Sequence, residues 1–127
     1  MLTTFRCQPS ADVCNRLLRR VADRDPIAFQ SLYRRLVGRV FRQAREGLGN
    51  TAAAVAVTKA AFVEVWRLAP VSGMRHPDAI RWLTAITARR VIERTETGAP
   101  RSVMAGHDEH TDRELAAVLN CDRISLL

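Results

Sequence analysis

Apolar side chains recur at helical spacing through most of the chain. The pair Asp25-Pro26 is a helix start signal, because Asp caps the first turn and Pro fits into it. After this pair, apolar residues follow at intervals of three and four as far as Ala44, and Gly47 and Gly49 then end the pattern. The spacing predicts that the longest helix lies here. A shorter helix precedes it, with its apolar side at Val13, Leu17, Leu18 and Val21.

The helix that follows Asn50, a suitable cap, is unusually free of charge. Its apolar stripe runs from Val57 to Ala69, and few charged residues occur on its other sides before Glu64 and Arg67. A surface helix normally carries more polar groups there. Either this helix is central and buried on several sides, or its bare face binds a partner. The pattern does not favour one over the other.

Two further helices are predicted after a breaker-rich loop at 70–77. Pro77-Asp78 opens the first of them, which ends near Gly98. Thr111 and Glu114 have the capping-box spacing that begins a short last helix. No segment shows the alternation typical of strands. The sequence therefore predicts an all-α, compact helical bundle of four to five helices over 1–100, followed by a linker and a short acidic C-terminal helix over 101–127.

The chain is strongly basic, and its charge is unevenly distributed. It carries a formal net charge of +7 over 127 residues, and Lys59 is its only lysine. Residues 1–49 hold ten Arg against four acids, whereas residues 102–127 hold two Arg against five acids. A basic body favours a polyanionic partner, above all nucleic acid, although a GC-rich coding sequence also enriches Arg.

Several classes of protein are disfavoured by the sequence. No apolar run approaches the roughly 18 residues of a membrane span, and the first ten residues lack the apolar core of a signal peptide. Three cysteines without CxxC spacing fit a reduced, cytoplasmic protein. His107 and His110 stand in a polar stretch without convergent ligands, so we expect no metal and no cofactor. The motifs of common enzyme classes are absent, and we expect no enzymatic activity.

Four segments in order resemble region 2 of the extracytoplasmic-function (ECF) class of bacterial sigma factors. The segments are Leu17–Phe29 with Leu32-Tyr33 after it, Phe62–Arg67, the Pro-containing loop that follows, and Trp82–Arg94. They lie in the family's order without a gap and cover more than half of the chain. The resemblance implies the helical fold of sigma region 2 and a role in bringing RNA polymerase to promoters.

The resemblance also implies which residues bind. In the family, the helix ending in the Phe–Trp pair binds the β′ clamp helices of the RNA polymerase core. The next loop receives a base flipped from the non-template strand of the promoter −10 element, and the last helix lies along the DNA. The implied polymerase-binding residues are Ala56, Lys59, Ala60, Val63, Glu64 and Arg67. The implied DNA-binding residues are Ser72, Gly73, Met74, Arg75 and His76 in the loop, and Arg81, Arg89, Arg90 and Arg94 on the helix.

These residue types suit the implied chemistry. A base taken out of its stack needs a loop pocket with hydrogen-bonding groups, and phosphates attract Arg on an exposed helix face. Trp66 and Trp82 lie on apolar stripes, which favours core packing for both.

The chain departs from the family pattern in two ways that keep an alternative function open. The family's polymerase-binding helix is usually acidic, whereas Ala, Val and Lys59 occupy the corresponding positions here. We also expect no region 4, the helix-turn-helix domain that reads the −35 element, before Leu127. The alternative is a divergent, polymerase-incompetent relative that acts as a protein-interaction or regulatory module, with an anti-sigma factor as its partner.

The acidic tail has two interpretations. The short helix can fold back and lay Leu115, Val118 and Leu119 on the domain, so that its acids cover the basic DNA-binding face as a phosphate mimic. The other interpretation, which the polar composition of the tail favours, is a loosely ordered linker.

Overall fold

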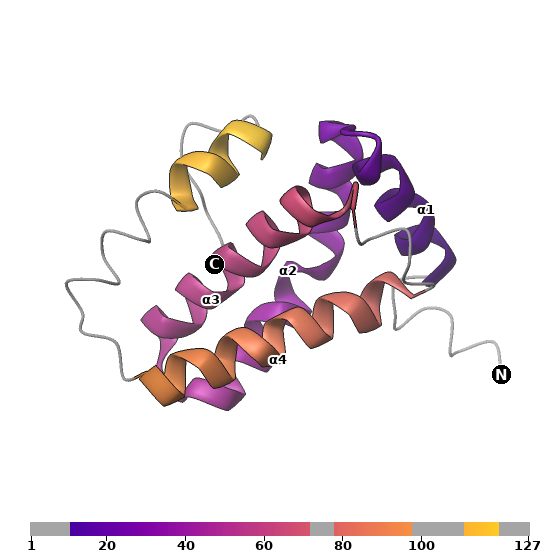
Figure 1. Cartoon of the computed structure of the whole chain (residues 1–127). Coiled ribbons are helices and arrows are strands. Elements are labelled where there is room, and N and C mark those ends of the chain that lie inside the picture. The colour runs from indigo at the N-terminus through magenta and orange to yellow at the C-terminus, as the bar shows by residue number, and fades with distance from the viewer. Residues whose placement is uncertain (1–10, 72–77, 98–110, 120–127) are drawn as a thin grey trace, which may run out of the picture.

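The protein is built from α-helices that pack around one main core. The computed structural model describes residues 11–71, 78–97 and 111–119, and none of these residues is in a strand. The elements are α1 (Ala11–Ala22), α2 (Pro26–Leu48), α3 (Thr51–Leu68) and α4 (Ala79–Thr97), followed by a short helix at residues 111–119 (Figure 1). The predicted all-α bundle and its short C-terminal helix are therefore confirmed.

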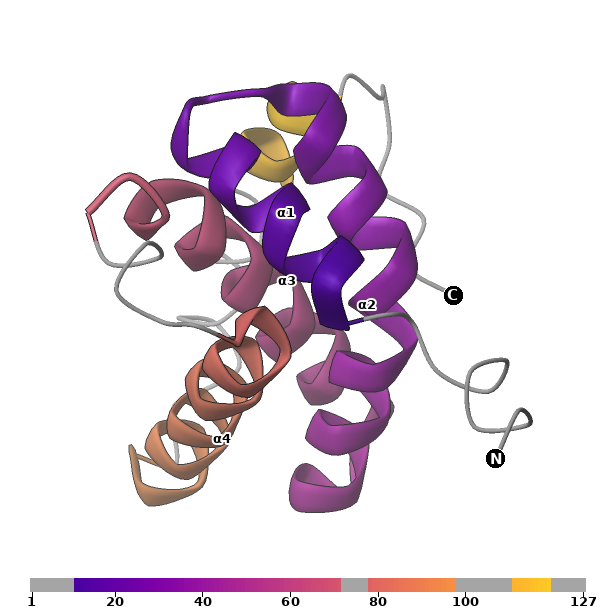
Figure 2. The same ribbon diagram turned by 90° about the vertical axis from the view of Figure 1, so that its right-hand side faces the viewer.

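The three long helices lie alongside one another, and α1 packs across one end of them. α2 is the central element, because it contacts α1, α3 and α4 (Figure 2). The helix at residues 111–119 lies on the side of α3 that faces away from α4 (Figure 1). α3 is thus enclosed by α2, α4 and the short helix, which answers why its sequence carries so few charges.

Both ends of α2 are set by the signals read from the sequence, with one difference. The carboxylate of Asp25 accepts hydrogen bonds from the backbone N–H groups of Ile27 and Ala28 and from the side chain of Arg20. These hydrogen bonds lower the pKa of Asp25, with the largest contribution from the backbone N–H of Ala28 and the next largest from the side chain of Arg20. Gly49 closes the helix in the left-handed conformation at φ 68°. The expectation that Gly47 also ends this helix was wrong, since α2 continues to Leu48.

An aromatic cluster joins α2 to α3 at the centre of the core. The ring of Phe62 makes edge-to-face contacts with Tyr33, at 4.9 Å between centroids, and with Phe29, at 6.4 Å. Trp66 lies 5.5 Å from Phe29 and is only half-buried, with the guanidinium of Arg24 4.8 Å above its ring. Core packing is therefore complete for Trp82, which is buried, and partial for Trp66.

Gly47 allows α2 and α4 to approach closely, and this gives a prediction with a matched control. A Cβ at Gly47 would lie 2.8 Å from Cγ1 of Val91, whereas a Cβ at Gly38 would meet nothing within 4 Å. Both residues lie inside the same helix, where Ala is preferred to Gly by about 1 kcal/mol. We expect Gly38→Ala to raise the free energy of unfolding by about 0.5–1 kcal/mol, and Gly47→Ala to lower it. Urea denaturation of the two variants measures the difference, and an equal gain in both would show that the helices separate freely at Val91.

Candidate functional site

The start of α4 is held by side chains from two elements. The carboxylate of Asp78 accepts hydrogen bonds from the backbone N–H groups of Ile80, at 3.0 Å, and Arg81, at 3.2 Å. The side-chain oxygen of Asn15 in α1 accepts the N–H of Ala79 at 2.7 Å. These bonds satisfy N–H groups that a helix start leaves without partners, and the bond from Asn15 fixes the first turn of α4 against α1. The sequence contained the Asp78 signal but no sign of the contribution of Asn15.

The four α4 arginines that were predicted to bind DNA do not form a single exposed row. Arg81 and Arg89 are exposed, whereas Arg90 and Arg94 are half-buried. At about 100° per residue, Arg81 and Arg89 lie about 80° apart on the outer face, and the other two point toward the opposite side. The outer face of α4 also carries Ile92, which is exposed.

Glu64 binds two of these arginines from α3. Nε of Arg90 donates to Oε1 of Glu64 at 2.7 Å, and Nη2 of Arg89 forms a close ion pair with Oε2. Arg89 also lies 3.4 Å from the carboxylate of Glu93, one turn along its own helix. The side chain of Glu64 is only 11% exposed. Glu64 was predicted with the polymerase-binding set, and the structure places it toward α4 instead.

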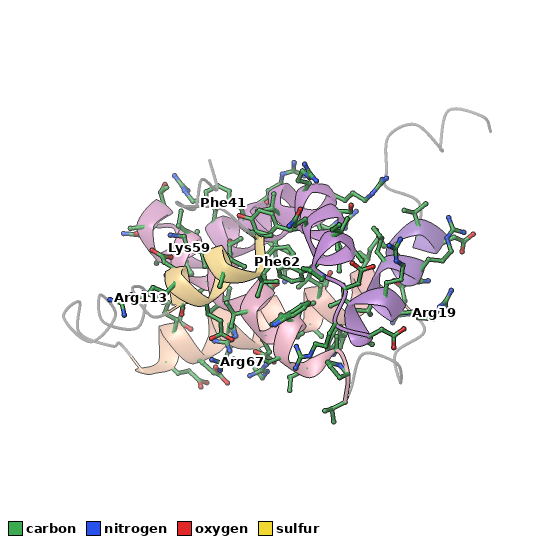
Figure 3. All side chains as sticks on the ribbon, turned by 90° about the horizontal axis from the view of Figure 1, so that it is seen from above. Arg19, Phe41, Lys59, Phe62, Arg67 and Arg113 are labelled. Carbon is green, nitrogen blue, oxygen red and sulfur yellow. The ribbon has the colours of Figure 1, made fainter. Side chains whose placement is uncertain are left out.

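The remaining predicted polymerase-binding residues share one face of α3, and another part of the chain covers it. Nζ of Lys59 lies 2.7 Å from the carboxylate of Asp112, and Nε of Arg67 donates to Glu114 at 2.7 Å. A second bond joins the same two side chains, and this pairing raises the pKa of Arg67. Figure 3 shows the short helix passing between Lys59 and Arg67. The other members of the face, two of them buried and one half-buried, are Ala56, Val63 and Ala60.

The C-terminal helix is folded back on the domain, so the favoured interpretation of the tail as a loosely ordered linker was wrong for residues 111–119. The other interpretation is correct for the apolar side chains of this helix but wrong for its acids. Leu115 and Leu119 belong to the main core, and Val118 packs against it. Asp112 and Glu114 pair with Lys59 and Arg67 on α3 rather than with the α4 arginines. The reason is geometric: the short helix lies on the side of α3 away from α4 (Figure 1).

A second basic surface runs along α2. Its arginines lie off the apolar stripe of this helix, and all of them are exposed. Within the described residues, Arg45 donates to the hydroxyl of Thr51, and no carboxylate pairs with the row. The row consists of Arg34, Arg35, Arg39, Arg42 and Arg45.

Several expected site residues lie outside the described residues. They are the loop positions Ser72, Gly73, Met74, Arg75 and His76. His107 and His110, at which no metal was expected, also lie outside these ranges. The described part of the chain holds no group of three or more side chains suited to a metal ion. In the same ranges, no helix combines the length and the apolar character needed to cross a bilayer. Cys14 is fully buried, and this burial raises the pKa of its thiol.

The chain is similar in sequence to known bacterial proteins. The chain is 32% identical over 93 residues to an ECF RNA polymerase sigma factor SigK of Mycobacterium tuberculosis, and equally to that of Mycobacterium bovis. The SigK of a further Mycobacterium strain is 31% identical over 81 residues. The chain is a homologue of the ECF RNA polymerase sigma factors. This confirms the resemblance found in the sequence segments between Leu17 and Arg94.

The homology covers part of each sigma factor. The matched stretch is 71% of this chain and 50% of the Mycobacterium tuberculosis SigK, so the chain spans about half the length of the curated relatives it matches. No protein-family profile matches the chain. No solved structure matches it either. The sigma-factor assignment therefore rests on sequence relatives, and the helical bundle is consistent with it.

Proposed function

We propose that the chain is a sigma-type module of transcription initiation that binds the RNA polymerase core and the non-template strand of the promoter −10 element. The observation that carries this proposal is the homology to ECF RNA polymerase sigma factors over 71% of the chain. The order of the matching segments and the all-α bundle support it.

The DNA-binding part of the proposal rests on α4 and the loop before it. Arg81 is exposed on the first turn of α4, next to the capped start that Asp78 and Asn15 hold in place. A fixed helix start beside a loop suits the capture of an unstacked base, and exposed Arg suits the flanking phosphates. Arg89 adds a second guanidinium on the same outer face, although Glu64 and Glu93 compete with phosphate for it. The basic row on α2 adds long-range attraction for nucleic acid.

Binding of a labelled single-stranded −10-like oligonucleotide tests the DNA-binding part. We expect Arg81→Ala to weaken binding roughly three- to tenfold and to reduce the slope of log affinity against log salt by about 0.7, the value for one phosphate contact on a single strand. Arg113→Ala is the matched control, because Arg113 is also exposed but lies on the short helix at 111–119. Fluorescence anisotropy at several salt concentrations provides the measurement. Equal losses of affinity in the two variants would mean that binding depends only on the net charge of the chain, and would contradict a DNA-binding site on α4.

The polymerase-binding part rests on the face of α3 that carries Lys59, Val63 and Arg67. In sigma factors this helix faces the β′ clamp helices, and retention of β′ at moderate salt in a pull-down with core polymerase is the expected result. The β′ subunit should be the retained partner. A blank pull-down both with this chain and with a variant in which the helix at residues 111–119 is displaced from this face would overturn this part of the proposal.

One observation favours the second candidate function, a protein-interaction module that does not bind polymerase. Lys59 puts a positive charge on a helix that is usually acidic in the family, and it is paired with the carboxylate of Asp112 in the same chain. Such a face fits an acidic partner, for which an anti-sigma factor is the expected class. A blank with core polymerase alongside a tightly bound second protein would favour this function over the first.

A further inference from the structure

The short helix at residues 111–119 has the pattern of a ligand for α3. At about 100° per residue, Leu115, Val118 and Leu119 form one apolar stripe. Asp112 and Glu114 fall on opposite sides of this stripe. The helix therefore presents an apolar centre with one carboxylate on each flank. Arg113 lies on the opposite side and is exposed.

The face of α3 has the complementary pattern. Lys59 and Arg67 are eight residues apart, or about 12 Å along a helix, and Val63 lies halfway between them on the same side. Val63 is only 7% exposed, and Ala56 and Ala60 provide small side chains on the same face. A crossing helix can approach closely over such small residues. We call this set of residues (Ala56, Lys59, Ala60, Val63 and Arg67) the α3 docking face.

The two patterns meet in the structure. Asp112 pairs with Lys59 and Glu114 with Arg67, so each flank of the short helix is held at one end of the docking face. Between them, Leu115 is 1% exposed and Leu119 is 9% exposed. The buried leucines supply most of the attraction, because partly exposed ion pairs contribute little individually. The ion pairs select an acidic helix and set its position.

We propose that the α3 docking face binds acidic amphipathic helices, that residues 111–119 are its intramolecular occupant, and that this helix must leave before the polymerase core can bind. This inference rests on the proposed function, since it takes the docking face as the polymerase-binding surface. An intramolecular occupant lowers the apparent affinity for an external partner by the fraction of molecules in which the face is free. The helix thereby sets the threshold for polymerase binding.

Reversing the charge of both clamping acids, Asp112 and Glu114, tests the proposal in the chain of residues 1–127. Asp112→Lys with Glu114→Lys removes two ion pairs and places like charges together, while leaving the buried leucines and the bundle unchanged. The matched control is Asp12→Lys with Glu46→Lys, which makes the same change in net charge at exposed acids of α1 and α2. Hydrogen exchange of the backbone amides at 111–119 reports release of the helix, and the amides of α2 report whether the bundle stays folded.

We expect exchange at 111–119 to rise roughly tenfold in the clamp variant and to stay unchanged in the control. Adding Lys59→Glu and Arg67→Glu to the clamp variant restores opposite charges across the contact and should restore protection. Leu115→Lys is a stronger second variant that should release the helix whatever the ion pairs contribute. Unchanged exchange in both variants would overturn the proposal.

Polymerase binding separates this proposal from the proposed function. We expect the clamp variant to bind the isolated polymerase core up to tenfold more tightly than the unmodified chain, and the charge-matched control to bind as the unmodified chain does. Release of the helix with unchanged polymerase affinity would overturn the internal competition and leave the proposed function standing. Failure of all variants to bind polymerase, including those with a released helix, would overturn the proposed function as well.

Discussion

Replacement of Phe62 by Ala is expected to lower the free energy of unfolding by about 3–5 kcal/mol, the largest effect of any single substitution that we predict. Phe62 is fully buried and makes edge-to-face contacts with both Phe29 and Tyr33 of α2. The substitution removes a ring from the centre of the core, where α2 and α3 meet. The surrounding side chains can collapse only partly into the space, because Phe62 belongs to a close-packed core to which all four long helices and the short C-terminal helix contribute side chains.

Chemical denaturation followed by circular dichroism measures this effect. Ile27→Ala is the control, since Ile27 is a large apolar residue that is 66% exposed, and its loss should change stability by no more than about 0.5 kcal/mol. Phe62→Leu should fall between the two and remains measurable if the Ala variant does not fold. A Phe62→Ala variant as stable as Ile27→Ala would contradict the aromatic cluster as the centre of the fold.

Replacement of Glu64 by Gln is expected to destabilise the protein by about 1–3 kcal/mol. The carboxylate of Glu64 is mostly enclosed and balances the guanidinium groups of both Arg89 and Arg90. Gln keeps the shape of the side chain but removes the charge, which leaves two cations facing each other at the α3–α4 contact. Glu93→Gln is the matched control, because Glu93 is 55% exposed and touches only the outer side of Arg89 at 3.4 Å. That change should cost less than about 0.5 kcal/mol.

The same pair of variants has a second readout that depends on the proposed function. Once Glu64 no longer holds it, Arg89 is available for a phosphate on the outer face of α4. We therefore expect Glu64→Gln to bind the −10-like oligonucleotide severalfold more tightly, with a steeper salt dependence, than Glu93→Gln does. Stability loss without any gain in DNA affinity would assign Glu64 a purely structural role and remove Arg89 from the DNA-binding set.

Local signals in the sequence were sufficient for most of the helical architecture. Asp25-Pro26, Asn50 and Asp78 start helices in the structure as their capping chemistry predicts, and Gly49 ends α2. Hydrogen bonds of this kind involve residues within one turn of each other, so they can be read from adjacent positions. Gly47 does not end α2, although the local pattern predicted that it would. Its role depends on Val91 of another helix, which no local pattern contains.

The candidate site was less predictable than the fold because its members are paired over long distances in the sequence. The resemblance to sigma factors placed Glu64 in the polymerase-binding set, but it could not show that two arginines of α4 would reach this carboxylate. The face of α3 that carries Lys59 allowed two interpretations, a buried helix or a bare binding surface. The structure supports burial, through a helix that begins about fifty positions later in the chain.

The sequence by itself determined the class of this protein: its apolar period and caps specify helices, and its ordered segments match the sigma-factor homology. The tertiary structure alone decided which charges are available to a partner. An Arg or an acid on the polar face of a helix has the same spacing in the sequence whether its side chain contacts solvent, a phosphate or a charged side chain of another element. An ion pair is set by the distance between two side chains in space, and this distance exists only once the helices have packed.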